Sequence, residues 1–113
     1  MSCSQYINPN KFPTFTSNHI WIYDEESYCI VNSQNIMYLT NKEVIFLNML
    51  LKNKVVTYEL MIKNMWDGSS NVTQNSLTLF VKNFRKKTPP KSIKNLHGIG
   101  YKIENNIIYR YKE

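Results

Sequence analysis

Residues 72–87, VTQNSLTLFVKNFRKK, predict a helix with two different faces. Leu77, Val81 and Phe84 recur at i, i+4 and i+7, so they lie on one side of a helix and can bury in a core. The other side fits the major groove of duplex DNA, because lysine and arginine neutralise phosphates and amides pair with adenine edges. The stretch alone fits equally well an ordinary amphipathic helix with a solvated face. The predicted outward side chains are Asn75, Leu79, Lys82, Asn83 and Lys86, with Thr78 and Arg85 on a flank.

The positive charge of the chain is concentrated in its second half. The 113 residues, 42% of them hydrophobic, are enough for one domain with its own core. The formal charge is +6, and residues 69–103 contain seven Lys or Arg and no Asp or Glu. A one-sided basic surface attracts a polyanion, most often nucleic acid, with an anionic membrane as the main competitor.

The sequence shows no membrane-spanning segment, no secretory signal and no cysteine pattern that indicates a metal site. The longest apolar run, residues 44–51, is far shorter than the roughly 20 residues that span a bilayer, and residues 1–12 do not resemble a secretory signal. The sequence therefore predicts a cytoplasmic protein that does not cross a membrane. Cys3 and Cys29 lack metal-ligand spacing and are too few for a disulfide framework, which favours two reduced thiols over a redox-sensing pair. Because no cluster of ligands accompanies His19, we predict no metal or cofactor.

The first part of the chain predicts an arm followed by a sheet and a helix. Residues 1–18 suggest a flexible arm or linker remnant, and residues 19–23, 28–32 and 35–39 predict a small antiparallel sheet. Thr40 and Glu43 then form a capping box that starts a helix ending near Asn53. Its predicted core residues are Val44, Leu47, Leu50 and Leu51, with Lys42, Asn48 and Lys52 outward.

A second helix and a hairpin are predicted on either side of the basic helix. Thr57 is an N-cap candidate for a helix over residues 58–66 that carries Leu60, Ile62 and Met65. The loop DGSSN joins it to the basic helix, which is a helix-turn-helix arrangement. After the two prolines, residues 93–96 and 101–103 predict a hairpin around HGIG, whose glycines suit the turn. A tight turn at residues 105–106 would send residues 107–111 back as another strand.

Four segments together resemble the OmpR/PhoB-type winged-helix DNA-binding domain of transcriptional response regulators. They are LTNKEVIFLNMLLKN, VVTYELMIKNMW, SLTLFVKNFRKK and LHGIGYKI, in that order, within residues 39–103. The resemblance implies an α+β fold over residues 19–113: a winged helix-turn-helix with an N-terminal antiparallel sheet, three helices and a C-terminal β-hairpin wing. It also implies that the helix at about residues 73–87 enters the major groove and that the wing, about residues 93–103, reaches the minor groove.

The family pattern assigns roles to individual residues. Trp66 matches a tryptophan that packs and offers its indole N–H to a phosphate, although a plain core tryptophan fits equally well. Asn75, Ser76 and Thr78 stand where the family commonly has Arg, Thr and Asp. Phe80 replaces a usually polar residue, and we expect it in the core rather than against thymine methyls. The implied DNA-contacting residues are Trp66, Gln74, Asn75, Ser76, Thr78, Leu79, Lys82, Asn83, Arg85, Lys86, His97 and Lys102.

The wing and the loop before the basic helix complete the implied site. His97 occupies a wing position that is usually arginine, and a histidine carries only part of a charge near neutrality, which weakens minor-groove contact. In the family the loop that corresponds to DGSSN is associated with contacting RNA polymerase. Here it consists of Asp67, Gly68, Ser69, Ser70 and Asn71.

The sequence thus favours a sequence-specific, double-stranded DNA-binding transcription regulator of the two-component type, acting as a dimer on repeated half-sites. The alternative is a protein-interaction module that contacts RNA polymerase or another regulator and binds DNA non-specifically. A small nuclease is least favoured, because no carboxylate cluster, nucleophile with its base or phosphate-binding glycine loop is visible. Residues 1–18 are too short for the receiver domain that usually precedes this domain, so the chain is either an effector domain cut from a longer regulator or a stand-alone DNA binder, which the initial methionine slightly favours.

Overall fold

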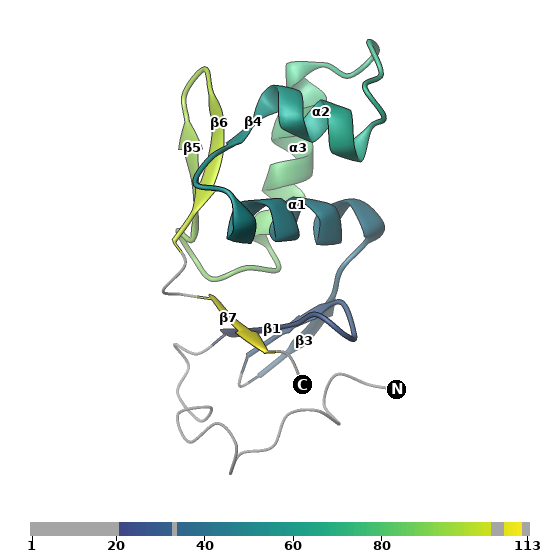
Figure 1. The fold of residues 1–113 in the computed structure, drawn as a ribbon. Helices are drawn as coiled ribbons and strands as arrows, with labels where there is room; N and C mark the ends of the chain where they lie inside the picture. The colour runs from purple at the N-terminus through teal and green to yellow at the C-terminus, as the bar shows by residue number, and fades with distance from the viewer. Residues whose placement is uncertain (1–20, 33, 105–107, 112–113) are drawn as a thin grey trace.

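Along the chain, three helices follow an N-terminal sheet and precede a C-terminal hairpin. In Figure 1 the helices lie above this sheet and beside the hairpin. The computed structural model describes residues 21–32, 34–104 and 108–111. The predicted arm, residues 1–18, lies outside the described residues. The elements in chain order are β1 (Trp21–Asp24), β2 (Cys29–Val31), β3 (Ile36–Tyr38), α1 (Asn41–Lys52), β4 (Val56–Thr57), α2 (Tyr58–Met65), α3 (Gln74–Arg85), β5 (Ile93–Leu96), β6 (Gly100–Ile103) and β7 (Ile108–Tyr111). This is the predicted α+β winged helix-turn-helix.

The N-terminal sheet contains a strand from the end of the chain. Its order is β3-β2-β1-β7, with the first three strands antiparallel as predicted and β7 parallel to β1. The strand predicted over residues 107–111 is therefore present as β7, but it does not return beside the preceding strand β6. β6 already pairs with β4 on one side and β5 on the other, so it has no free edge for another strand. The predicted turn at residues 105–106 lies outside the described residues.

The start of α1 confirms the predicted capping box. The Thr40 hydroxyl accepts a hydrogen bond from the backbone N–H of Glu43 at 3.3 Å, and the Glu43 carboxylate accepts one from the backbone N–H of Thr40 at 2.8 Å. The same carboxylate also receives the Lys87 ammonium at 2.8 Å, and Lys87 donates to the Tyr38 carbonyl. The end of the basic segment is thereby tied to β3 and to the beginning of α1.

The core face of α1 is rotated from the predicted one. Phe46 is fully buried and contacts the rings of Phe80, Phe84 and Tyr101, whereas the predicted Val44 is only half-buried. The buried positions of α1 follow the i, i+3, i+4, i+7 spacing of a single helix face. Leu51 is seven residues beyond Val44, so both lie on the same half-buried flank. The buried residues of α1 are Glu43, Phe46, Leu47 and Leu50.

The second helix is capped as predicted and buries two methionines. The Thr57 hydroxyl accepts a hydrogen bond from the backbone N–H of Leu60 at 3.1 Å, which confirms the N-cap. Met61 and Met65, one turn apart, are buried. Leu60 and Ile62, named in the sequence with Met65 as apolar residues of this helix, are half-buried and pack against the core.

The hairpin of β5 and β6 needs each of its glycines for a different reason. Gly98 has φ +78, a conformation that glycine adopts without strain, in the turn between the strands. Gly100 lies so close to the backbone of Val56 in β4 that a Cβ atom there would collide with it. The first glycine shapes the turn, and the second lets β4 pair with β6.

Cys29 contradicts the prediction of reduced thiols. It is fully buried in β2 and is disulfide-bonded. The prediction rested on the small number of cysteines and on their spacing, and neither prevents a single bond. Cys3 lies outside the described residues.

Candidate nucleic-acid interface

The basic helix α3 is anchored by one face and leaves the other free. It begins after Thr73, whose hydroxyl accepts a hydrogen bond from the backbone N–H of Ser76 at 3.2 Å. Leu77, Val81 and Phe84 are buried as predicted. In Figure 1, α3 crosses behind α1 and α2. The residues of α3 predicted to contact DNA are all exposed: Gln74, Asn75, Ser76, Thr78, Leu79, Lys82, Asn83 and Arg85, followed by Lys86 at the C-cap.

Among the described residues, no acidic side chain forms an ion pair with the lysines on the outward side of α3. Neither Lys82 nor Lys86 belongs to the ion pairs found among the described residues, which join Lys87 to Glu43 and Lys94 to Glu104. The helix itself contains no Asp or Glu. Its outward lysines are therefore available to an anionic ligand, whereas Lys87, next in the same basic segment, is engaged within the protein.

Two residues predicted to contact DNA face the wing. The Arg85 guanidinium donates a hydrogen bond to the carbonyl of Ile93 in β5 at 3.1 Å. Burial and the nearby Tyr58 raise the pKa of Tyr101 in β6, and the Thr78 side chain and the charge of Arg85 offset only part of this rise. The Arg85 bond joins α3 to β5, and Thr78 lies near Tyr101 of β6.

Phe80 and Trp66 belong to an aromatic cluster at the edge of the core. The Phe80 ring stacks on Phe84 with a centroid distance of 6.1 Å and meets Trp66 edge-on at 5.8 Å, so its predicted place in the core is confirmed. The ammonium group of Lys42 lies over the Trp66 ring, 4.7 Å from its centroid. Trp66 is half-buried and packs against the core, and its predicted phosphate contact stays a prediction.

The wing is held against the beginning of α2. The Tyr58 hydroxyl donates to the Asn95 side chain at 3.3 Å, and the backbone N–H of Tyr58 donates to the carbonyl of Ile99 at 3.1 Å. His97 is exposed near the wing tip and Lys102 is half-buried. Sequence reasoning missed Tyr58 and Asn95, because only the folded chain brings α2 and β5 together.

Residues 67–71, in the connection between α2 and α3, are all exposed. Asp67 and Gly68 both have positive φ, and the backbone N–H of Gly68 donates to the carbonyl of Ile62 at 2.9 Å, which ends α2. The side chain of Ser69 accepts a hydrogen bond from the backbone N–H of Asn71 at 3.2 Å. The exposed residues of this loop are Asp67, Gly68, Ser69, Ser70 and Asn71.

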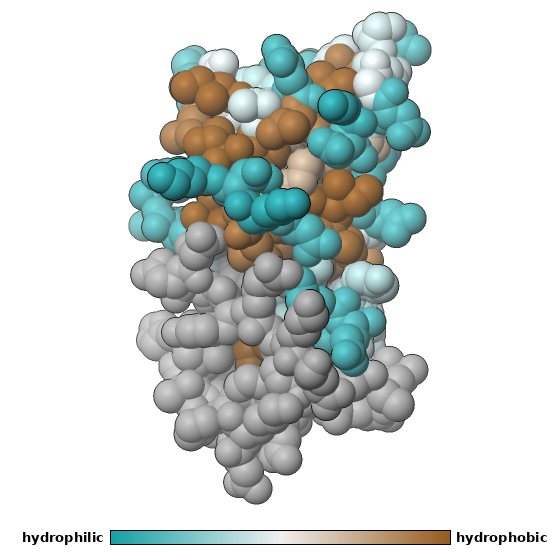
Figure 2. Space-filling model, viewed as in Figure 1, coloured by the Kyte–Doolittle hydropathy of each residue, from teal (hydrophilic) through white to brown (hydrophobic). Residues whose placement is uncertain are grey.

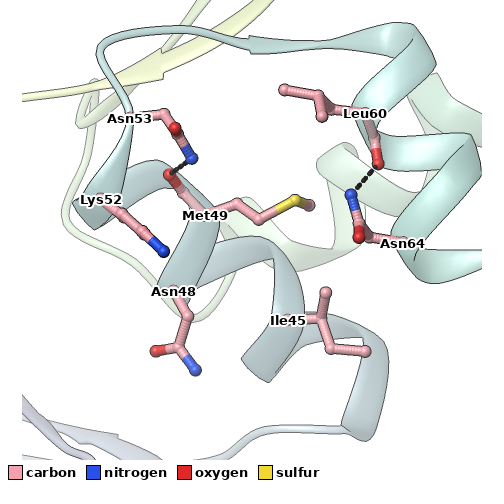
Figure 3. Close-up of a pocket in the computed structure, with 7 residues that line it drawn as sticks. All are labelled: Ile45, Asn48, Met49, Lys52, Asn53, Leu60 and Asn64. Atoms are coloured by element: carbon pink, nitrogen blue, oxygen red, sulfur yellow. Dashed lines mark hydrogen bonds between the residues drawn. The ribbon is translucent and has the colours of Figure 1, made fainter.

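A groove of about 370 Å³ lies between α1 and α2 and contains no residue of α3 (Figure 3). Figure 2 shows the face over α1 and α2, where apolar and hydrophilic surface alternate. Asn53 and Asn64 use their amides to donate to the carbonyls of Met49 and Leu60 in their own helices. The groove lining is Ile45, Asn48, Met49, Lys52, Asn53, Leu60 and Asn64. This surface is separate from the candidate interface on α3.

The described part of the chain contains neither a group of metal ligands nor a membrane-spanning helix. Within it, no three His, Cys, Asp or Glu side chains are grouped so that they could hold a metal ion. None of the helices described there is long and apolar enough to cross a bilayer.

Comparison with known proteins identifies the family. A family model described as "Transcriptional regulatory protein, C terminal" matches residues 33–103, more than half of the chain. The chain belongs to the OmpR/PhoB-type family of response-regulator DNA-binding domains. This family consists of DNA-binding domains of transcription regulators and not of enzymes.

Individual relatives of this OmpR/PhoB-type domain are response regulators. The chain is 31% identical over 71 residues to the regulatory protein VanRB of Enterococcus faecalis. This alignment covers 61% of this chain and 32% of that protein. It is 37% identical over 60 residues to the response regulator protein GraR of Staphylococcus haemolyticus. That alignment covers 51% of this chain and 27% of GraR. The chain therefore spans about a third of the length of these relatives.

The fold is shared with a solved domain. The crystal structure of the DNA-binding domain of Bacillus subtilis CssR superposes with a TM-score of 0.64 at 22% sequence identity. The match covers 74% of this chain and 99% of that domain. At this identity the likeness establishes the winged-helix fold alone.

Proposed function

We propose that residues 19–113 form a sequence-specific, double-stranded DNA-binding domain of a transcription regulator. In this proposal α3 enters the major groove and the hairpin of β5 and β6 reaches the adjacent minor groove. The observation that carries it is the exposed outward side of α3, where lysines that have no acidic partner among the described residues lie beside amides. The match to a family of DNA-binding domains also supports DNA as the ligand.

The outward residues divide by the chemistry they offer to DNA. Lys82 and Lys86 neutralise phosphates, and Asn75 and Asn83 pair with adenine edges. Ser76 lies in the first turn of the helix, where hydroxyl and backbone N–H groups suit a phosphate. The remaining members of the proposed interface are Gln74 and Leu79 in α3, the Trp66 indole N–H, and His97 and Lys102 in the wing.

Thr78 and Arg85 have a different primary role in this proposal. Arg85 is hydrogen-bonded to β5 and Thr78 lies near Tyr101 of β6, so both lie where α3 meets the wing. The angle between α3 and the wing determines whether both reach their grooves together. Arg85 uses one of its guanidinium donors on Ile93, and an arginine has five, so donors remain for a phosphate.

Selection from a random-sequence duplex pool at two salt concentrations tests this proposal. We expect a retained motif and an affinity that falls steeply with salt, because phosphate contacts release counterions. A repeat of the motif would give the spacing of two protomers on DNA. Retention without a motif, or an affinity that is the same at both salt concentrations, would contradict sequence-specific binding.

A second candidate function is contact with RNA polymerase or another regulator through the α2–α3 loop. It is favoured by the complete exposure of residues 67–71. Replacing these residues by a glycine-serine linker should abolish transcription activation and leave DNA affinity unchanged if the loop contacts polymerase. Full activation by this variant would exclude that function.

A further inference from the structure

Leu79 is the most exposed large hydrophobic side chain among the described residues, at 58% of its surface. It lies in α3, opposite the buried Leu77 and Phe84. A solvated helix face ordinarily carries polar side chains there, and the positions one turn before and after it are Asn75 and Asn83. An apolar group at this place gains nothing from the protein core.

Two other apolar side chains are excluded from the same role. Phe80, the next residue, is taken up by ring contacts with Phe46, Trp66 and Phe84. Ile99 is 55% exposed but lies in the wing. The wing is proposed to meet the minor groove, where thymine shows no methyl group.

The major groove offers one apolar group on the edges of base pairs, the C5 methyl of thymine. We propose that Leu79 is a specificity-determining residue that packs against a thymine methyl in the half-site. This inference rests on the proposed binding of α3 in the major groove. Asn75 and Asn83 lie about 6 Å along the helix on either side of Leu79, so adenine edges beside that thymine complete an A·T-rich half-site.

The test replaces each thymine of the selected half-site, one at a time, by deoxyuridine, which pairs identically but lacks the methyl. At one position we expect wild-type affinity to fall about fourfold, the effect of losing one buried methyl. Leu79→Ala should bind the thymine and deoxyuridine duplexes equally at that position and keep the wild-type discrimination at all others. In a duplex with a C·G pair at that position, 5-methylcytosine should bind the wild type more strongly than cytosine does, because it returns a methyl to the same place in the groove.

Ile45→Ala is the matched control, since it removes an exposed apolar side chain in α1, outside the helix and hairpin that are proposed to meet DNA. It should retain the thymine preference in full. Thermal unfolding of Leu79→Ala should match the wild type, because the side chain is not part of the core.

Failure of the thymine contact can be distinguished from failure of the proposed sequence-specific binding. If a motif is selected but Leu79→Ala and the wild type respond identically to every deoxyuridine, the thymine contact is wrong and sequence-specific binding stands. If Leu79→Ala keeps all DNA affinity and loses only transcription activation, Leu79 serves a protein partner and the proposal is likewise wrong. If no motif is selected, the proposed function and this inference both fail.

Discussion

The two faces of α3 differ in what fixes their side chains. On the buried face, Leu77, Val81 and Phe84 are at most 2% exposed, and Phe84 contacts Phe46 across the core. On the outward face, Lys82 and Lys86 form no ion pair within the described residues. The helix therefore separates the groups that hold it from those that can meet a ligand. Substitutions on one face should change stability, and substitutions on the other should change binding.

The largest expected effect comes from the buried side. Phe46→Ala should lower the free energy of unfolding by about 3 to 5 kcal/mol, because it removes a ring in contact with Phe80, Phe84 and Tyr101 and leaves a cavity. Urea unfolding measures this change. Ile45→Ala, next to it and 37% exposed, is the control and should cost less than about 1 kcal/mol. Similar losses for both would mean that α1 is not packed through Phe46.

Asn75→Ala probes the outward side and should act on binding instead. We expect a loss of about 1 to 3 kcal/mol on the selected site, because an amide that pairs with a base edge is removed. The free energy of unfolding should stay within about 0.5 kcal/mol of wild type, since Asn75 is exposed. Titration of cognate and random duplexes separates the two roles. An equal loss on random DNA would show that Asn75 only positions the protein.

Lys82→Ala should have a smaller and less selective effect. If its ammonium meets a phosphate, binding weakens about equally on all duplexes and the salt slope falls by about one unit. Lys87→Ala is the matched control, because this lysine is held by Glu43 and Tyr38. It should lower stability and leave the salt slope unchanged. A salt slope that changes in the Lys87 variant and not in the Lys82 variant would reverse the assignment of the two sides.

The smallest expected effect concerns the wing at acid pH. Lys94, 2.8 Å from Glu104, holds the pKa of that carboxyl below its usual value of 4.5 through a hydrogen bond and its charge. The unfolded chain therefore binds a proton more readily, so this pair stabilises the fold above pH 4.5 and the contribution is lost as pH falls through the lowered pKa. Glu104→Gln should slightly reduce the decrease in melting temperature between about pH 7 and about pH 3. An unchanged pH profile would mean that the pair does not form in solution.

Local signals in the sequence predicted the helix starts well. Thr40 and Thr57 cap α1 and α2 as expected, because a cap depends on groups within three or four residues. The outward side of α3 was also predicted, since its buried stripe fixes which way the helix faces. The wing turn followed from Gly98, whose positive φ is a local requirement.

Features that depend on distant partners were not predictable in the same way. Phe46 and Val44 are both apolar, and only packing against α3 and β6 decides which of them is central. Arg85 was assigned to DNA because it keeps the family's basic pattern, and nothing in the sequence indicates its hydrogen bond to the carbonyl of Ile93. The bonded state of Cys29 likewise depends on contacts made after folding.

The parallel pairing of β7 with β1 has a consequence for how the domain is made. The strand that borders Trp21–Asp24 is Ile108–Tyr111, so the first sheet draws on both ends of the described chain. A contact over this sequence separation forms late, because the intervening chain must first be brought together. During synthesis the helices and the wing leave the ribosome before β7 does. The edge of β1 that receives β7 therefore stays unpaired until β7 has emerged. The first sheet cannot be completed before the helices and the wing have been translated.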